Sequence, residues 1–363
     1  MNLRIPGPTP CPPEVRAAAG RAMIDHRGEE FVSLHRRLVP RLQALFRTRH
    51  DVLLLTASGT GALEGAIVNT LSPGDRVLAV SVGAFGDRFA EIARAHGAAV
   101  TVLAFEPGSP ADPSSVARAL DADPSIRAVL LTHNESSTGV TNDVRSIAEV
   151  VRARGPLLLL DSVSGVGALP LETDAWGVDL VATASQKAWM APPGLAMVAV
   201  APSAWEANGR ARMPRFYFDF GRARDFAAKG QTPWTPAVSV LFALEAALDR
   251  IEREGLEALL ERHRRLGRRT REGMKALGLR LLAEGPHASD SVTAVRAPEG
   301  IDVAELRRRL RTDHGVVLAG GQGSLKGKVF RIAHLGFVSD AEIDEVLQAL
   351  RSVLEGMGFR RAG

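Results

Sequence analysis

Short apolar runs alternate with amphipathic stretches from residue 51 to residue 200, and this rhythm limits the possible folds more than any other feature of the sequence. The runs at 52–55 and 157–160 consist of Val and Leu, and their length suits strands that are buried on both faces. Strands that alternate with helices form crossover units, which build a mainly parallel sheet covered by helices. The strands expected here span 52–55, 76–82, 99–105, 128–131, 157–160, 180–183 and 196–200, and the helices 61–71, 85–96, 113–122 and 144–154.

The remainder of the chain predicts a second, smaller α/β layer. An irregular stretch at 213–226 is followed by long helical patterns at 236–254 and 256–277, with Pro236 at the start of the first and Gly255 past its end. Strands at 291–296 and 329–333 and helices at 303–313 and 340–356 complete it. We expect an α/β protein with an N-terminal arm at 1–20, a large domain at 21–254 and a small C-terminal domain at 255–363.

Charge and cysteine content exclude several classes of protein. The 363 residues include 45 Lys+Arg and 41 Asp+Glu, a net charge of +4 that is too balanced for a nucleic-acid-binding surface. No apolar run approaches the length of a membrane span. The single cysteine, Cys11, excludes an internal disulfide, and the nine histidines lack metal-ligand spacing, so we expect no metal. The chain opens without an apolar signal segment, which predicts a cytoplasmic protein.

The segment Thr56-Ala-Ser-Gly-Thr-Gly61 directly follows a predicted strand and opens a helix. Its small residues allow backbone N–H groups and a hydroxyl to approach an anion at the positive end of the helix, which suits a phosphate. It matches neither the Gly-x-Gly-x-x-Gly nor the Walker pattern. Taken alone, it is more typical of an ordinary strand-to-helix turn with a Ser or Thr cap than of a phosphate site.

Asp161 and Lys187 end two predicted strands, at positions where the carboxyl ends of parallel strands face a ligand crevice. Alone, the aspartate is typical of a turn and the lysine of a solvated surface. Together with the phosphate segment they predict one ligand site, in which Asp161 meets a cationic ring nitrogen and desolvation activates the amine of Lys187 for Schiff-base chemistry. The sequence contains only five lysines, so few other amines are available.

Four motifs stand out along the chain: Thr132-His-Asn-Glu-Ser-Ser-Thr-Gly139, Asp161-Ser-Val163, Ser185-Gln-Lys-Ala188 followed by Ala191-Pro-Pro-Gly194, and Gly327-Lys-Val-Phe-Arg-Ile332. Together they resemble the class V aminotransferases, most closely the alanine–glyoxylate and serine–pyruvate (serine–glyoxylate) branch. The resemblance extends from Pro6-Gly-Pro-Thr-Pro10 to the last helix. It implies a fold-type I enzyme that uses pyridoxal 5′-phosphate (PLP), forms a homodimer and shares its active sites between subunits.

The resemblance also implies a role for each site residue. Lys187 would bind PLP covalently and move the substrate's α-proton, and Asp161 would pair with the ring nitrogen. Arg331 would hold the substrate carboxylate, near Gly7 and Ser136. The residues left to bind the cofactor are Ser58, Gly59 and Thr60 at the phosphate, Phe85 and Val163 at the ring faces, Ser136 and Gln186 at the phenolic oxygen, and Thr232 and Thr235 at the phosphate of the neighbouring subunit.

We therefore expect transfer of an amino group from alanine or serine to a 2-oxo acid such as glyoxylate or pyruvate. Aspartate or aminoethylphosphonate are alternative substrates, because Arg215, Arg222 and Arg224 could supply a second anion site. A non-catalytic accessory subunit is a further alternative, although the pair Asp161 and Lys187 argues against it. A desulfurase is disfavoured because Cys11 lies in the N-terminal arm. His133 is more typical of a packing residue than of a catalytic base.

Overall fold

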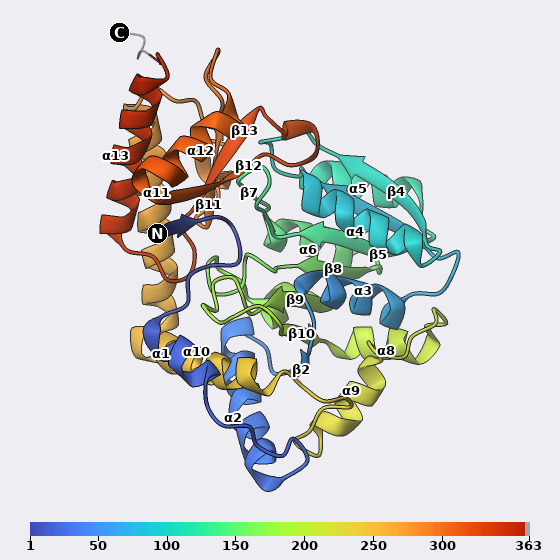
Figure 1. The fold of residues 1–363 in the computed structure, drawn as a ribbon. Coiled ribbons are helices and arrows are strands. Elements are labelled where there is room, and N and C mark those ends of the chain that lie inside the picture. Colours follow the sequence, from blue (N-terminus) through green and yellow to red (C-terminus); the bar gives the residue numbers. More distant parts are fainter. Residues whose placement is uncertain (360–363) are drawn as a thin grey trace.

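The computed structural model describes residues 1–359, and it contains a seven-stranded sheet in the order β2-β10-β9-β8-β5-β3-β4 (Figure 1). Four of the pairings are parallel, and only β10 runs antiparallel, to β2 and to β9. The mainly parallel sheet is confirmed. Its strands are β2 (Asp51–Leu55), β3 (Arg76–Ser81), β4 (Ala99–Ala104), β5 (Ile126–Thr132), β8 (Leu157–Asp161), β9 (Leu180–Ala184) and β10 (Ala196–Val200).

Helices cover both faces of this sheet. Successive residues of each strand point to opposite faces, and both faces carry apolar side chains that the helices bury. In β2, Val52 and Leu54 join one hydrophobic cluster, and Leu53 and Leu55 join the other. The first cluster includes residues of α1 (Pro13–Ala19), α2 (Glu29–Phe46), α5 (Pro113–Ala122), α6 (Val144–Arg152), α7 (Thr173–Trp176) and α10 (Val238–Glu254). The second includes residues of α3 (Gly59–Thr70), α4 (Ala84–Ala95), α8 (Pro202–Arg210) and α9 (Phe220–Ala227).

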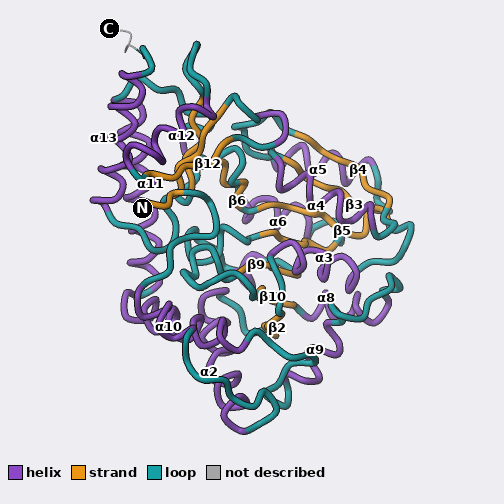
Figure 2. Tube along the Cα trace, in the orientation of Figure 1, coloured by secondary structure: helices purple, strands orange, loops and turns teal. Residues whose placement is uncertain are grey.

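A smaller four-stranded sheet has the order β1-β12-β13-β11 and stands apart from the large sheet (Figure 2). The start of the chain belongs to it, because β1 pairs with β12 through Asn2↔Val316. Helices α11, α12 and α13 pack on it around Phe330 and Ile332. These elements are β1 (Asn2–Arg4), β11 (Val292–Arg296), β12 (Val316–Gly320), β13 (Val329–Ala333), α11 (Leu256–Ala276), α12 (Val303–His314) and α13 (Asp340–Gly356), with short 3₁₀ turns at Gly285–His287 and Gly323–Leu325.

The structure contains the elements expected between residues 51 and 200, with ends that differ by a few residues. The expectation of an irregular stretch at 213–226 is wrong from Phe220 onward, because α9 begins there with Asp219 as its cap. The expected boundary near residue 255 falls at the turn between α10 and α11, where Gly255 has φ 82°. The division into an arm and two domains stays a prediction.

The carboxyl ends of β5, β8 and β9 lie together at the edge of the large sheet that faces the smaller one (Figure 1). Thr132 is level with Asp161, and Asp161 with Ala182. A short hairpin of β6 (Asn134–Glu135) and β7 (Val140–Thr141) extends from β5 toward the smaller sheet. Within residues 1–359, no helix is both long and apolar enough to cross a membrane.

Candidate active site

Lys187 lies three residues beyond the end of β9 and is held by the start of the chain. Its side chain is 9% exposed, and Nζ donates a hydrogen bond of 2.7 Å to the carbonyl oxygen of Pro6. Gly7 packs directly against it, since a Cβ atom at that position would lie 2.6 Å from Nζ. Thr9 fixes the backbone on the other side by donating its hydroxyl to the Lys187 carbonyl at 2.9 Å. The N-terminal segment therefore determines where the amine points.

Asp161 is the last residue of β8 and is 4% exposed. Its Oδ1 accepts a hydrogen bond of 2.9 Å from the backbone N–H of Val163. Burial raises the pKa of Asp161 to about 6, although this hydrogen bond and the positive charge of Lys187 oppose the rise. Burial likewise lowers the pKa of Lys187 to about 8, which Asp161 opposes and Arg331 and Arg88 reinforce. The two predicted catalytic groups are thus brought together, and the amine loses its proton more readily than an ordinary lysine.

Arg331 reaches the same site from the smaller sheet. Its neighbours Phe330 and Ile332 lie in the core of that sheet, so alternation turns the guanidinium away from the core. Nε donates to the carbonyl of Gly320 at 2.8 Å and Nη1 to the carbonyl of Ser136 at 2.9 Å. Burial lowers its pKa to about 10. Arg331 lies on an inner strand of the smaller sheet, because β13 pairs with both β12 and β11.

The predicted phosphate segment forms the N-terminus of α3. Ser58 is the N-cap residue, and its hydroxyl accepts from the backbone N–H of Gly61 at 3.4 Å. Thr60 is exposed on the first turn. Gly59 allows a close approach, since a Cβ atom there would lie 2.6 Å from Cγ2 of Val163. The N–H groups of this helix end and the residue predicted to cover one ring face are therefore adjacent.

Phe85, the other predicted ring contact, lies in the first turn of α4 and is positioned by a residue that the sequence interpretation missed. The buried carboxylate of Glu135 accepts hydrogen bonds from the backbone N–H groups of Phe85 (3.0 Å), Gly86 (3.1 Å) and Ser137 (3.1 Å). Burial raises the pKa of Glu135 against these hydrogen bonds. The sequence signal that could have indicated Glu135 was an acidic residue within the motif at 132–139, directly after a predicted strand.

Arg88 was also missed. It lies one turn after Phe85, with its guanidinium carbon 4.9 Å from the centre of the Phe85 ring. Its charge lowers the pKa values of both Asp161 and Lys187, which places it within electrostatic reach of the site. No signal in the sequence distinguished it among the many arginines of this chain.

The remaining predicted residues differ in whether they contact a residue of the site. Gln186 precedes Lys187, and its Oε1 is buried without a hydrogen-bond partner among residues 1–359. Ser136 contributes its carbonyl to Arg331. Thr232 is buried, with its hydroxyl donating to the Trp234 carbonyl at 2.8 Å, whereas Thr235 is exposed. Their contact with a neighbouring subunit stays a prediction.

His133 has the structural surroundings of a packing residue. Its ring is buried, and Nδ1 lies 3.0 Å from the hydroxyl of Ser162. Burial lowers its pKa to about 4, which keeps the ring neutral.

The arginines considered for a second anion site have other contacts. Arg215 donates to the carbonyls of Val68, Ala211 and Asn208. Arg222 stacks on Phe216 and Trp234, and Arg224 stacks on Trp205. The expectation that they supply this site finds no support in these contacts.

Comparison with known proteins identifies the family. The profile described as Aminotransferase class-V matches residues 14–340. The chain belongs to the class V aminotransferases. It is therefore a PLP-dependent transaminase of fold type I.

Similar proteins carry several names. The chain is 45% identical to the soluble hydrogenase small subunit of Synechococcus sp., covering 98% of this chain and 94% of that protein. It is 40% identical to the L-aspartate–glyoxylate aminotransferase of Paracoccus denitrificans (98% and 91% covered) and 37% identical to the serine–glyoxylate aminotransferase of Methylorubrum extorquens (94% and 88% covered). The crystal structure of an alanine–glyoxylate aminotransferase from Nostoc sp. superposes with a TM-score of 0.94 at 30% identity, covering 97% and 94% of the two chains.

The residues present fit PLP. The exposed hydroxyls and N–H groups at the start of α3 suit its phosphate. The buried carboxylate of Asp161, whose pKa is raised by desolvation, would gain an opposite charge from a protonated ring nitrogen. The unpartnered Oε1 of Gln186 marks a polar position directly beside Lys187 that the protein itself does not satisfy.

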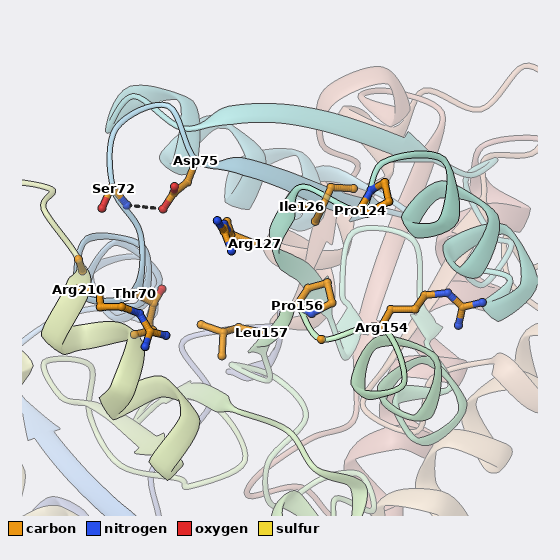
Figure 3. A pocket seen from close by; sticks show the side chains of 13 residues that line it. Thr70, Ser72, Asp75, Pro124, Ile126, Arg127, Arg154, Pro156, Leu157 and Arg210 are labelled. Atoms are coloured by element: carbon orange, nitrogen blue, oxygen red, sulfur yellow. Dashed lines mark hydrogen bonds between the residues drawn. The ribbon is translucent and has the colours of Figure 1, made fainter.

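A pocket of about 520 Å³ lies at the opposite edge of the large sheet (Figure 3). It is lined by the first residues of β5 and β8, Ile126 and Leu157, and by Arg127 and Arg210. Arg154 at its rim is bound by Asp121 through hydrogen bonds of 2.7 and 2.9 Å. None of the predicted site residues lines this pocket.

Proposed function

We propose that this aminotransferase moves the amino group of a small amino acid, alanine or serine, to a 2-oxo acid such as glyoxylate or pyruvate, and that it acts as a cytoplasmic homodimer. The observation that carries the proposal is the convergence of Lys187, Asp161 and Arg331 on one edge of the sheet, each 9% exposed or less. The names of the serine–glyoxylate and alanine–glyoxylate relatives support these substrates.

Each predicted residue has a place in this proposal. Lys187 would bind PLP covalently, and Asp161 would pair with the ring nitrogen. Ser58, Gly59 and Thr60 would hold the phosphate, Phe85 and Val163 would cover the two faces of the ring, and Ser136 and Gln186 would approach the phenolic oxygen. Thr232 and Thr235 would complete the phosphate site of the neighbouring subunit, and Gly7 would border the substrate.

The protein's own groups would bind the substrate and move its proton. PLP supplies an electron sink for the carbanion that forms when the α-proton leaves. An amine with a pKa of about 8 is partly neutral at neutral pH, so Lys187 can accept that proton. Arg331 holds the substrate carboxylate with the guanidinium hydrogens that remain beside its bonds to Gly320 and Ser136.

Aspartate is a second candidate donor, favoured by one residue. Arg88 is a half-buried cation within electrostatic reach of Lys187, and no carboxylate forms a salt bridge with it within residues 1–359. It could meet the side-chain carboxylate of aspartate, or the phosphonate of aminoethylphosphonate, in place of Arg215, Arg222 and Arg224. The Paracoccus relative is named for aspartate. If aspartate is used, Arg88→Ala should reduce kcat/KM for aspartate much more than for serine or alanine, which share only the effect of Arg88 on Lys187 and Asp161.

The relative named as a hydrogenase subunit raises the question of an accessory role. Iron–sulfur clusters are held by several cysteine thiolates, whereas this chain has only Cys11. The intact pair Lys187 and Asp161 supports catalysis instead. A yellow protein that transaminates would agree with the proposal, and a colourless, inactive one would contradict it.

The homodimer is supported by an exposed aromatic patch formed by Phe216, Tyr217 and Trp234. Phe216 and Tyr217 are 67% and 46% exposed, and both rings stack on Trp234. Thr235 lies next to this patch in the sequence and is exposed. Large exposed apolar groups of this kind favour an interface. Sedimentation at micromolar concentration should show a dimer. A monomer that binds PLP as tightly as the dimer does would contradict active sites that are shared between subunits.

The decisive test of the proposal is Lys187→Ala with a panel of donors and acceptors. The wild type should transfer amino groups from serine or alanine to glyoxylate or pyruvate, and the variant should not, because the reacting amine is lost. Lys275→Ala, which removes an exposed lysine of α11, is the matched control and should keep full activity. Retained turnover in Lys187→Ala would overturn the proposal.

A further inference from the structure

The side chain of Asn134 joins the two sheets through a buried polar network. Nδ2 donates to the hydroxyls of Ser164 and Ser291, each at 2.8 Å. Oδ1 accepts from the hydroxyl of Ser289 at 2.6 Å. Asn134 and Ser164 belong to the region around the large sheet, whereas Ser289 and Ser291 directly precede β11 of the smaller sheet. All four side chains are buried.

The hydrogens of this network can each be assigned to one acceptor. Ser164 donates its only hydroxyl hydrogen to the backbone carbonyl of Asn134 at 3.0 Å, so it can only accept from the side chain. Ser289 gives its hydrogen to Oδ1, and its oxygen lies 3.2 Å from the Ser291 hydroxyl, which can therefore donate to it. Both amide hydrogens of Asn134 then have acceptors. An Asp at this position could not donate, so Ser164 and Ser291 would have to turn their hydroxyl hydrogens to the carboxylate and give up the acceptors that they have now.

The serine segment is connected to Arg331 by the smaller sheet. The backbone N–H of His334 donates to the Ser291 carbonyl at 3.0 Å, which ties the segment to the residue just after β13. β11 pairs with β13 so that Ala294 lies opposite Arg331. Arg331 in turn donates to the carbonyl of Ser136, two residues after Asn134. The contacts close into a ring that includes both Asn134 and the guanidinium.

We propose that Asn134 is a positioning residue, which fixes the smaller sheet against the 134–136 segment and thereby the direction of the Arg331 guanidinium. The inference rests on the proposed role of Arg331 in holding the substrate carboxylate. Loss of the amide lets β13 shift relative to the cofactor side of the site, so recognition of a carboxylate weakens more than the reactivity of the cofactor.

The test compares two reagents that react with enzyme-bound PLP without turnover. Aminooxyacetate carries a carboxylate and O-methylhydroxylamine does not, so the ratio of their second-order rate constants, followed by absorbance, measures carboxylate recognition. Holoenzyme is used for the wild type, Asn134→Asp, Arg331→Ala and Asn69→Asp. Asn69 is the matched control, because it is also a buried asparagine, donating to the Gly65 carbonyl at 2.8 Å, but it lies in α3 far along the chain from the ring of contacts.

We expect Asn134→Asp to lower the ratio by on the order of tenfold, toward the value of Arg331→Ala. Asn69→Asp should lower the melting temperature and leave the ratio unchanged. If Asn134→Asp does not yield folded holoenzyme, Ser291→Ala removes one arm of the network and should lower the ratio in the same direction.

Two results would overturn the inference: an unchanged ratio in Asn134→Asp and Ser291→Ala, or a lowered ratio that Arg331→Ala does not share. These outcomes are separable from failure of the proposed function. The reagents require no transamination, so a wild type that transfers no amino group from serine or alanine would contradict the substrates and leave the result on Asn134 intact.

Discussion

The amine of Lys187 donates a hydrogen bond of 2.7 Å to the carbonyl oxygen of Pro6, a residue 181 positions earlier in the chain. The first residues of the protein are therefore part of the site. The same segment continues through Thr9, whose hydroxyl donates to the Lys187 carbonyl. The reactive group is held at both its tip and its backbone by a segment that precedes every strand of the large sheet.

Gly7→Ala should impair catalysis, because the added Cβ would lie 2.6 Å from Nζ and must displace the amine. We expect kcat to fall by on the order of tenfold or more, since small misplacements of reacting groups are costly. Steady-state kinetics with the best donor will measure this. Gly209→Ala in α8 is the control, because nothing lies within 4 Å of its added Cβ, and equal kcat in both variants would contradict the contact.

The rate of PLP incorporation into apoenzyme should rise with pH through a midpoint near pH 8. The neutral amine forms the covalent bond, and burial lowers the pKa of Lys187 to about 8, so half of the amine is neutral at that pH and the rate levels off only above it. An ordinary lysine would give a midpoint at about pH 10.4. Stopped-flow absorbance across this range distinguishes the two, and a midpoint near 10 would show that the amine is not desolvated.

The sequence predicted the sheet because each buried strand is visible as a short apolar run. It predicted that Asp161 and Lys187 lie in one site because both follow the ends of strands, and the carboxyl ends of parallel strands lie at the same edge of a sheet. It did not predict that Pro6 and Gly7 enclose Lys187, because that contact depends on the pairing of β1 with β12. Glu135 was missed for a related reason: its partners are N–H groups of α4, some fifty residues earlier. α9 was missed because aromatic and arginine residues obscure its helical pattern.

Asp161→Asn should keep PLP bound but slow the half-reaction. Asn retains an oxygen that can accept from the Val163 N–H, so the local structure should persist. Without a carboxylate the ring nitrogen is no longer held protonated, and removal of the α-proton should slow by on the order of a hundredfold or more. Single-turnover absorbance with serine or alanine measures the rate, and a wild-type rate would remove Asp161 from this role.

Glu135→Gln should destabilise the protein and loosen Phe85. Both carboxylate oxygens accept from backbone N–H groups, so an amide nitrogen at either position faces a donor. A buried donor left without an acceptor costs about 1–3 kcal/mol, which should lower the melting temperature of the apoenzyme and the affinity for PLP. Asp112→Asn at the exposed N-cap of α5 should change little, because Asn also caps helices. Equal melting temperatures for both variants would show that Glu135 is not needed at the start of α4.

Arg331→Ala should discriminate between substrates by their carboxylate. The guanidinium is 5% exposed and is held by the carbonyls of Gly320 and Ser136, so the positive charge is desolvated before a substrate arrives. A substrate carboxylate that pairs with it gains a strong interaction, and its loss should cost roughly 2–5 kcal/mol of transition-state binding for alanine or serine. An amine without a carboxylate never forms this contact, so its kcat/KM should change little. Measuring both substrates with the wild type and the variant decides the question: equal losses would mean that Arg331 supports the fold rather than the substrate.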